Sequence, residues 1–334
     1  MYILHANIVN EVRKANCFDF LRYFFAFFLI LSHYLTLSEH DSVWFLAGSL
    51  RVKAFFVITG FLVTYSFLRR NCNLKSYAVK RFVRIVPAYL CTIMFCILLG
   101  CCISRLALSD FFSSAQTWRY AVANIFMLNW LEPCLPGVFE GNSMQSVNGS
   151  LWSMKVESLF YVLVPMIIWL VGKAGKHTVM TAVMAASVLF YNILPVQLQY
   201  FTYFFGGMSM LLYFDSFMKF KYLIVSIAAL NEFILYSGIC PALNFTVQSL
   251  EPIFFTATLL FVAYNVKSLN FMRRYDNITY GLFLYHFPVI QVFIYFGLPE
   301  HHFWLSFFSI TFVTAALAYM SWIWIEKPLM NRYK

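Results

Sequence analysis

Residues 18–37 read FDFLRYFFAFFLILSHYLTL, an almost unbroken apolar run whose acidic, basic and imidazole side chains are Asp19, Arg22 and His33. The hydrocarbon core of a bilayer is about 30 Å thick, so an α-helix needs roughly 20 apolar residues to cross it. The run has this length and composition. It therefore predicts a transmembrane helix that carries a few ionisable groups.

The composition of the whole chain agrees with this prediction. Of its 334 residues 61% are hydrophobic and only 11% are charged, against about 25% charged residues in soluble domains. Such a chain has too little polar surface for a soluble globular enzyme, a disordered chain or a small disulfide-stapled domain. The eight cysteines show no metal-binding spacing, and we expect no metal cofactor. The fold class predicted is an all-α polytopic membrane protein.

Ten apolar runs are long enough to be read as membrane spans. They lie at about residues 18–37, 44–68, 85–103, 150–171, 178–194, 198–214, 222–239, 252–266, 278–296 and 303–325. A further segment, 118–131, is apolar but short and polar in places, which favours an interfacial or re-entrant helix. We expect residues 1–334 to form a single membrane domain with no appended soluble domain.

The basic residues indicate which side of the membrane each loop faces. The net charge is +10, and most Lys and Arg fall in alternate loops, as expected for cytoplasmic loops. The intervening loops carry few basic residues and hold acidic ones, among them Glu39, Glu251 and Glu300. This pattern predicts ten crossings with both termini in the cytoplasm.

Charged groups inside a span are costly and are functional candidates. Arg22 and His33 are eleven residues apart on the first predicted helix, which puts them on one face and about 16 Å apart along its axis. The alternative is a snorkelling arginine and an interfacial histidine. Arg51 and Lys53 lie in the second helix, at a depth similar to His33.

A second polar group opens the fourth helix. Residues 148–153 read NGSLWS, and Ser153, Glu157 and Tyr161 follow at helical i, i+4 and i+8 spacing. They form one polar stripe, which should face protein or a water-filled cavity rather than lipid. The alternative is a capped helix start whose carboxylate pairs with Lys155.

Three further features leave alternatives open. Arg81 and Arg84, with Lys80, suit a phosphate site, although the bias towards cytoplasmic positive charge also explains such a cluster. His286 is expected about a third of the way in from the cytoplasmic end of the ninth helix, where packing is the more common role. Glu232 lies mid-membrane beside Asn231 and is unassigned.

These motifs together resemble the acyltransferase-3 family of membrane O-acyltransferases, which modify surface polysaccharides and glycolipids. The resemblance rests on six stretches in order: residues 18–22 with His33, FFVITGFL at 55–62, KRFVRIVP at 80–87, NGSLWS at 148–153 with Glu157, YHFP at 285–288 and EKP at 326–328. Thr59 replaces the usual serine. Lys53 stands where many members have an acidic or apolar residue, which leaves its role in doubt.

The resemblance implies acyl transfer, most often of acetyl, from cytoplasmic acetyl-coenzyme A to a sugar hydroxyl of a polysaccharide or glycolipid such as lipopolysaccharide. It implies that Arg22, Arg81 and Arg84 hold the coenzyme phosphates. His33 would be the general base and Glu157 would support its imidazole, with Ser153 or Tyr161 stabilising the oxyanion. Asp19, Lys53 and His286 are further site candidates. An acyl-His intermediate is the alternative to direct transfer.

The implied location is the cytoplasmic (inner) membrane of a bacterium, with lipid, acyl-coenzyme A and glycan as partners and no nucleic acid. Two other functions compete with this interpretation. Buried charges would also serve a transporter or flippase of a lipid-linked glycan, but the chain shows no inverted repeat. A non-catalytic assembly subunit would tolerate replacement of His33 and Glu157.

Overall fold

The computed structural model describes residue 12 and residues 16–40, 48–69, 73–191, 193, 196–237 and 244–333. Within these ranges every regular element is helical and no strand occurs, which confirms the all-α prediction. The basic residues Arg13, Lys14, Arg70 and Lys334, on which part of the predicted sidedness rests, lie outside the described residues.

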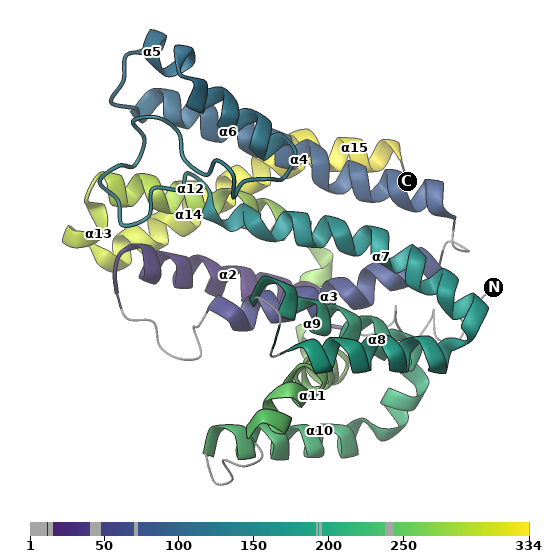
Figure 1. Cartoon of the computed structure of the whole chain (residues 1–334). Helices are drawn as coiled ribbons and strands as arrows, with labels where there is room; N and C mark the ends of the chain where they lie inside the picture. Colours follow the sequence, from purple (N-terminus) through teal and green to yellow (C-terminus); the bar gives the residue numbers. More distant parts are fainter. Residues whose placement is uncertain are drawn as a thin grey trace. The chain divides into compact units, whose positions relative to one another are not determined.

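The helices follow one another along the chain, and residues 126–148 form a long irregular connection between α6 and the short helix η2 (Figure 1). The longer ones are α2 (Phe18–Leu37), α3 (Gly48–Leu68), α4 (Leu74–Ile103), α6 (Ala115–Ile125), α7 (Trp152–Ala174), α8 (Lys176–Tyr191), α9 (Val196–Leu212), α10 (Phe214–Ser237), α11 (Asn244–Asn265), α12 (Thr279–Tyr295) and α14 (Phe303–Ser321). The shorter ones are α5 (Leu108–Ser113), η2 (Gly149–Leu151), η4 (Lys267–Arg274), α13 (Leu298–His301), the π-helical η5 (Trp322–Glu326) and α15 (Lys327–Arg332).

Each of the ten predicted runs falls on one of these helices. Among the described residues, six helices have the length and hydropathy of a membrane span, and a seventh does if η4 and α12, which meet at 83°, form one broken span. Helices α8 and α9, with 16 and 17 residues, are shorter than those six helices. Helix α6, with 11 residues, is too short to cross a bilayer.

Two predicted boundaries were wrong. Helix α4 begins at Leu74, so Arg81 and Arg84 lie on the helix and not in a loop before it. At about 45 Å this helix is longer than the hydrocarbon core. Helix α11 begins at Asn244 and contains Pro252, so Glu251 is a buried helical residue rather than a loop acid.

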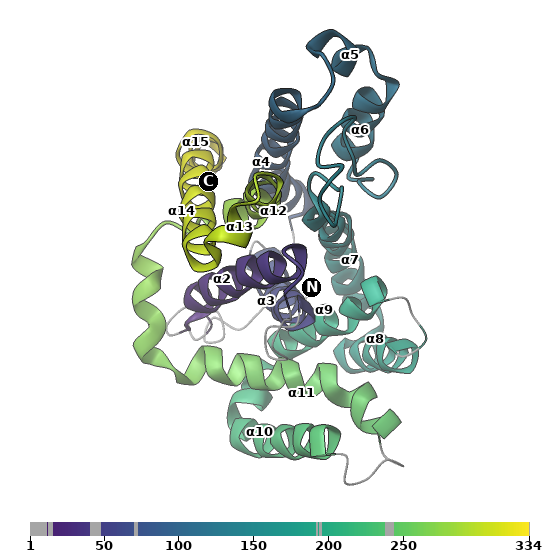
Figure 2. The ribbon, with the colours of Figure 1, turned by 90° about the vertical axis from the view of Figure 1, so that its left-hand side faces the viewer.

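The chain forms two compact units, each assembled from separate stretches. The first comprises 1–22, 51–77 and 159–275, and the second comprises 23–50, 78–158 and 276–334. In the first unit α10 packs along α11, and in the second α12 packs along α14, as both ribbon views show (Figures 1 and 2).

Glycines bring helices of the first unit into close contact. A Cβ atom at Gly60 on α3 would lie 2.1 Å from the backbone oxygen of Phe204, and one at Gly207 on α9 would lie 2.2 Å from that of Val57. Small residues allow this approach of backbones, which is how membrane helices associate without a hydrophobic driving force. Gly60 belongs to the FFVITGFL stretch, so that motif has a packing role.

The core of the second unit fixes the face of α2 that carries His33. Ile30, Tyr34 and Leu37 pack with Phe287 and Ile290 of α12 and with residues of α14. The Tyr34 hydroxyl donates a hydrogen bond to the backbone oxygen of Phe303 at 2.7 Å. Since these α2 residues recur at i, i+4 and i+7, position 33 lies on the same side and is turned towards α12.

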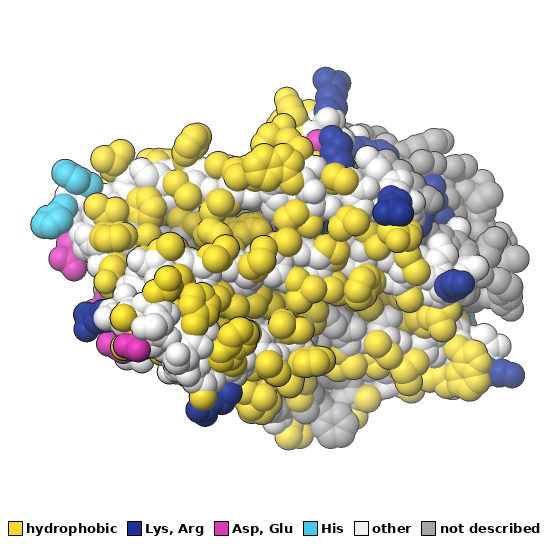
Figure 3. Space-filling model, turned by 90° about the horizontal axis from the view of Figure 1, so that it is seen from above, with side chains coloured by type: hydrophobic (Ala, Val, Ile, Leu, Met, Phe, Trp, Pro, Cys, Tyr) yellow, Lys and Arg dark blue, Asp and Glu magenta, His cyan; other side chains and the backbone are white. Residues whose placement is uncertain are grey.

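The outer surface has the polarity expected of a membrane protein. On the face in Figure 3, hydrophobic side chains cover the middle, whereas charged and histidine side chains lie towards its two ends. Many large apolar residues on α4, α7 and α14 are exposed. Exposed apolar surface of this extent is stable in contact with lipid chains.

We expect Gly60→Ala to destabilise the protein and Gly172→Ala not to. A methyl group at Gly60 would overlap backbone atoms, whereas nothing lies within 4 Å of a Cβ at Gly172 of α7. The expected loss in the free energy of unfolding is about 1–3 kcal/mol for Gly60→Ala. Thermal unfolding of the two purified variants in detergent measures it, and equal melting temperatures would contradict the packing role.

Candidate active site

The structure brings two histidines together. Nδ1 of His33 on α2 lies 2.7 Å from Nε2 of His286 on α12, and the two rings are stacked with an interplanar angle of 8°. His286 is fully buried, and His33 is half-buried. Phe287 packs against His33 with its edge, at 5.6 Å between ring centroids. The pair is therefore held by packing on several sides.

Backbone carbonyls determine which ring nitrogens carry hydrogen. Nδ1 of His286 lies 2.8 Å from the oxygen of Phe283 and 3.1 Å from that of Leu282. A carbonyl oxygen only accepts, so Nδ1 of His286 must be protonated and, in the neutral ring, its Nε2 must accept. His33 then donates from Nδ1, and the lone pair of a neutral His33 is on Nε2. This tautomer is the one that a general base requires.

The stagger of α12 against α2 brings His286 level with His33. The Tyr23 hydroxyl donates to the backbone oxygen of Asp276 at 2.6 Å and accepts from the amide of Ile278 at 3.2 Å. Helix α12 therefore begins beside Tyr23, five residues into α2. Because of this stagger, His286, close to the middle of α12, lies level with His33 in the last third of α2.

Asn148 anchors the start of the α7 segment to the turn of α12 that carries His286. Its side-chain amide donates to the backbone oxygen of Leu284 at 2.8 Å, and both residues are buried. In a regular helix this oxygen would accept from the amide of residue 288, but Pro288 has no N–H. The asparagine thus satisfies a carbonyl that the proline leaves without its helical donor.

The rest of the NGSLWS stretch strengthens this junction. Ser150 Oγ donates to Asn148 Oδ1 at 2.7 Å, which orients the amide. A Cβ at Gly149 would lie 2.7 Å from the ring of Phe287, so glycine allows the segment to approach α12. Ser153 and Glu157 follow on α7, both half-buried.

The stripe of Ser153, Glu157 and Tyr161 lies on one unbroken helix, as its spacing predicted. Tyr161 belongs to the first compact unit, where its backbone oxygen accepts from the Tyr77 hydroxyl at 3.1 Å. This is again the carbonyl four residues before a proline, Pro165. The roles of Glu157, Ser153 and Tyr161 in chemistry stay predictions.

The predicted phosphate-binding arginines have defined neighbours. Arg84 acts electrostatically on the carboxylate of Glu326, which is 2% exposed and accepts a hydrogen bond from Ser321 at 3.3 Å. Glu326 ends the π-helical turn η5, a distortion often found at functional sites. Arg22 on α2 lies 3.5 Å from Asp19, one turn before it.

An ion pair fixes the helix that follows Glu326. Lys327 Nζ lies 2.8 Å from the carboxylate of Asp276, in the turn before α12. Its hydrogen bond holds the pKa of the Asp276 carboxyl below its usual value, because the ionised form is favoured. Asp276 is also the residue whose backbone binds Tyr23, so the ends of α2, α12 and α15 are connected here.

Lys53 belongs to the first compact unit, where it pairs with Glu251 at 3.1 Å. The other carboxylate oxygen of Glu251 accepts a hydrogen bond from the Tyr203 hydroxyl. Arg51 is 1% exposed. Glu232 on α10 interacts electrostatically with both Lys53 and Glu251. These contacts give Lys53 a buried structural partner that sequence reasoning did not identify.

The chain was compared with known proteins. The profile of a family described as "Acyltransferase domain", acyltransferase-3, matches residues 16–323. The chain belongs to the acyltransferase-3 family. This membership confirms the family that the motifs indicated. The protein is therefore an acyltransferase, and the transporter and assembly-subunit interpretations are set aside. With its apolar helices, it is an integral membrane acyltransferase.

The acyltransferase is similar to two full-length relatives. A protein named "O-acetyl transferase" of Shigella phage Sf6 is 25% identical, over 96% of this chain and 98% of its own length. "Nodulation protein 10" of Rhizobium leguminosarum bv. viciae is 28% identical, over 95% and 93%. An uncharacterized protein of Haemophilus influenzae is 27% identical over 37% of this chain and half of its own. No solved structure matches the chain.

We expect Asn148→Ala to destabilise the acyltransferase because it leaves the buried oxygen of Leu284 without a donor. An unsatisfied buried acceptor costs about 1–3 kcal/mol in the free energy of unfolding. In a Pro288→Ala background the loss should be smaller, since residue 288 then supplies its own amide. Unfolding of the wild type, the two single variants and the double variant in detergent gives this double-mutant cycle. An equal loss of unfolding free energy from Asn148→Ala in the two backgrounds would contradict the view that Asn148 replaces the amide missing at Pro288.

Proposed function

We propose that the protein transfers an acyl group, most readily acetyl, from cytoplasmic acetyl-coenzyme A to a hydroxyl of a cell-surface polysaccharide or glycolipid sugar. The observation that carries this proposal is the His33–His286 pair, joined at 2.7 Å with a tautomer that puts the lone pair of His33 on Nε2. The printed name of the phage relative, "O-acetyl transferase", supports acetyl as the group.

The proposed reaction uses His33 as general base. Nε2 of His33 takes the proton from the acceptor hydroxyl while the oxygen attacks the thioester carbonyl carbon. A C–O bond forms, the C–S bond breaks, and the imidazolium returns the proton to the leaving thiolate. His286 keeps the ring of His33 oriented throughout, because it accepts from Nδ1 in both protonation states. In the alternative, the same Nε2 carries the acyl group as an acyl-His intermediate.

The donor is proposed to bind through the arginines of α2 and α4. The coenzyme carries phosphates, which Arg side chains bind by charge-assisted hydrogen bonds. Arg22 is about 16 Å from His33 along α2, a length that suits the extended arm of the coenzyme. Glu326 holds Arg84 in place by its charge, and we assign it a positioning role.

Further roles are proposed for α7. Glu157 would stabilise the imidazolium of His33 electrostatically, and Ser153 or Tyr161 would donate to the developing oxyanion. Their support is their position on the helix whose start is anchored next to His286. We further propose that all ten helices cross a bacterial cytoplasmic (inner) membrane with both termini inside, and that lipopolysaccharide is one possible class of acceptor.

We expect His33→Ala to abolish acetyl transfer, with kcat falling by about 10²–10⁴ because the general base is lost. His286→Leu should lower kcat by about 10², whereas His286→Gln should retain most activity because its amide oxygen can accept from Nδ1 of His33. Release of coenzyme A by purified protein and mass spectra of the surface glycan measure these effects.

The level of folded protein in the membrane and its melting temperature are the controls for these histidine variants. Full acetylation with His33→Ala would remove His33 from the mechanism. Equal activity of His286→Leu and His286→Gln would show that the hydrogen bond to His33 has no part in catalysis.

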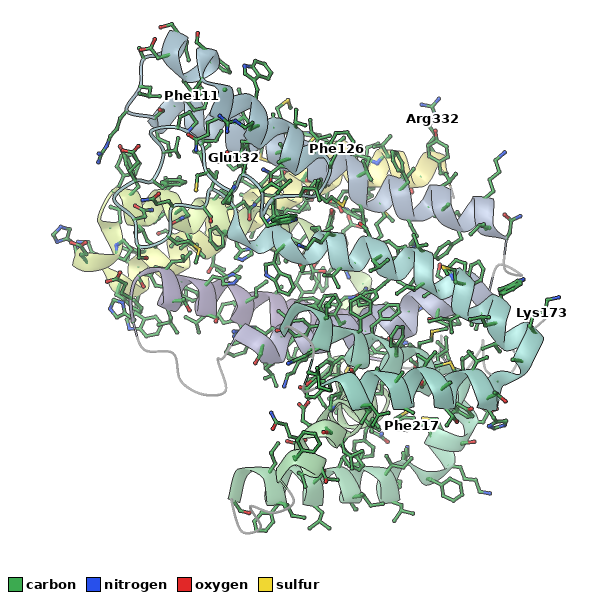
Figure 4. The ribbon with its side chains drawn as sticks, in the orientation of Figure 1. Phe111, Phe126, Glu132, Lys173, Phe217 and Arg332 are labelled. Atoms are coloured by element: carbon green, nitrogen blue, oxygen red, sulfur yellow. The ribbon has the colours of Figure 1, made fainter. Side chains whose placement is uncertain are left out.

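Arg81→Ala and Arg84→Ala are expected to raise the KM for acetyl-coenzyme A about tenfold each, because each removes a hydrogen bond to a phosphate. The KM for the acceptor should change little. Arg332→Ala is the matched control, since Arg332 is exposed and projects outward from the end of α15 (Figure 4). Unchanged coenzyme affinity in both variants would show that these arginines serve membrane orientation only.

A further inference from the structure

A polar cavity of about 400 Å³ lies in the second compact unit, where α2 and α12 end. This volume is within the usual range of small-molecule sites, about 300–1,000 Å³. Its lining includes the side chains of Glu39, His40, Arg105, Asn142, Tyr295 and Glu300. None of these residues was a site candidate from sequence.

The cavity lies near the histidine pair, measured along the axes of α2 and α12. Leu37, which lines it, is four residues after His33 on α2, or about 6 Å along the axis. Ile294, which also lines it, is eight residues after His286 on α12, about 12 Å along the axis. A ligand in the cavity would therefore be within one or two helical turns of the pair.

Several polar groups in the wall are already occupied by structural bonds. Asn142 donates to the backbone and side-chain oxygens of Gln291, each at 3.0 Å, and Ser143 donates to the oxygen of Leu37 at 2.9 Å. By contrast, no hydrogen bond or ion pair to another described residue involves the carboxylates of Glu39 and Glu300. These two groups are acceptors available to a ligand.

Glu39 occupies a backbone position that normally selects glycine. Its φ is +57°, and it comes two residues after Leu37, the last residue of α2. The amide of His40 donates to the oxygen of Leu35 and the amide of Glu39 to that of Thr36, which is the Schellman arrangement that usually has glycine at this place. A side chain here costs stability, so its presence points to a use for the carboxylate.

The charges of the lining restrict the kind of ligand. The lining contains two carboxylates, those of Glu39 and Glu300, and one guanidinium, that of Arg105. Arg105 itself lies 3.6 Å from Glu140, which is outside the lining. Carboxylates accept hydrogen bonds from hydroxyl groups, of which a sugar offers several. An anionic group would be repelled by the excess of negative charge.

We propose that this cavity binds the acceptor sugar. The sugar unit that receives the acyl group is then a neutral or amino sugar rather than a uronate or phosphorylated sugar. Glu39 and Glu300 bind its hydroxyl groups and orient one of them towards His33. The inference rests on the proposed function and adds the acceptor site and its charge preference. Coenzyme phosphates are excluded from this cavity by the same charges.

Two carboxylate variants test the assignment. Glu39→Gly deletes the carboxylate while giving the helix end the residue that its backbone favours, and Glu300→Gln removes the other charge. We expect each to raise the acceptor KM at least about tenfold with the KM for acetyl-coenzyme A unchanged. The melting temperature of Glu39→Gly should not fall. Asp110→Asn, an exposed acid outside the cavity, is the matched control.

A third variant fills the cavity. Gly141 lines it and nothing lies within 4 Å of a Cβ there, so Gly141→Trp should fold and block acceptor binding. Gly172→Trp makes the same change at another open position, outside the cavity, and should keep activity.

The experiment uses the full chain in lipid nanodiscs with acetyl-coenzyme A. The acceptor is surface glycan from cells that lack the protein, treated with mild alkali to remove existing acyl groups. An unchanged acceptor KM in the carboxylate variants, full activity of Gly141→Trp, or acylation of a uronate would each overturn the cavity assignment. Absence of any transfer by the wild-type protein would instead contradict the proposed function itself.

Discussion

Inside a bilayer there is no water to satisfy a backbone carbonyl, and the junction around Leu284 is built on this constraint. Pro288 removes the amide that Leu284 would otherwise bind, and the side chain of Asn148 takes its place. One hydrogen bond therefore connects the start of the α7 segment to the turn of α12 that carries His286. In the first compact unit the Tyr77 hydroxyl donates in the same way to the carbonyl of Tyr161, which lies four residues before Pro165.

Backbone carbonyls of the same turn of α12 also determine where the histidines carry hydrogen. The carbonyls of Leu282 and Phe283 fix the proton of His286 on Nδ1, and through the 2.7 Å contact they fix that of His33 as well. Backbone carbonyls thus define a protonation pattern of the kind that a carboxylate defines in a Ser-His-Asp triad. A neutral histidine also avoids placing a second charge in a low-dielectric region, where it would need its own partner.

The sequence was sufficient for the helices and the motifs, but not for their register. The apolar runs located every long helix, and the six stretches identified the family. The contact between His33 and His286 was not predicted, because the bonds of Tyr23 to Asp276 and Ile278, more than 250 residues away in sequence, set where α12 begins. Glu251 looked like a loop residue before Pro252, yet Lys53 and Tyr203 pair with its carboxylate and allow α11 to continue through it.

The two histidines also limit how much positive charge the site can hold. With one added proton, His33 carries N–H groups on both nitrogens and still donates to His286, so the hydrogen bond between the two rings survives. A second added proton would put hydrogen on Nε2 of His286, and two N–H groups would then oppose each other across 2.7 Å. The pair can therefore hold only one added proton. A base that takes a proton there must transfer it to another group before it can take a second one.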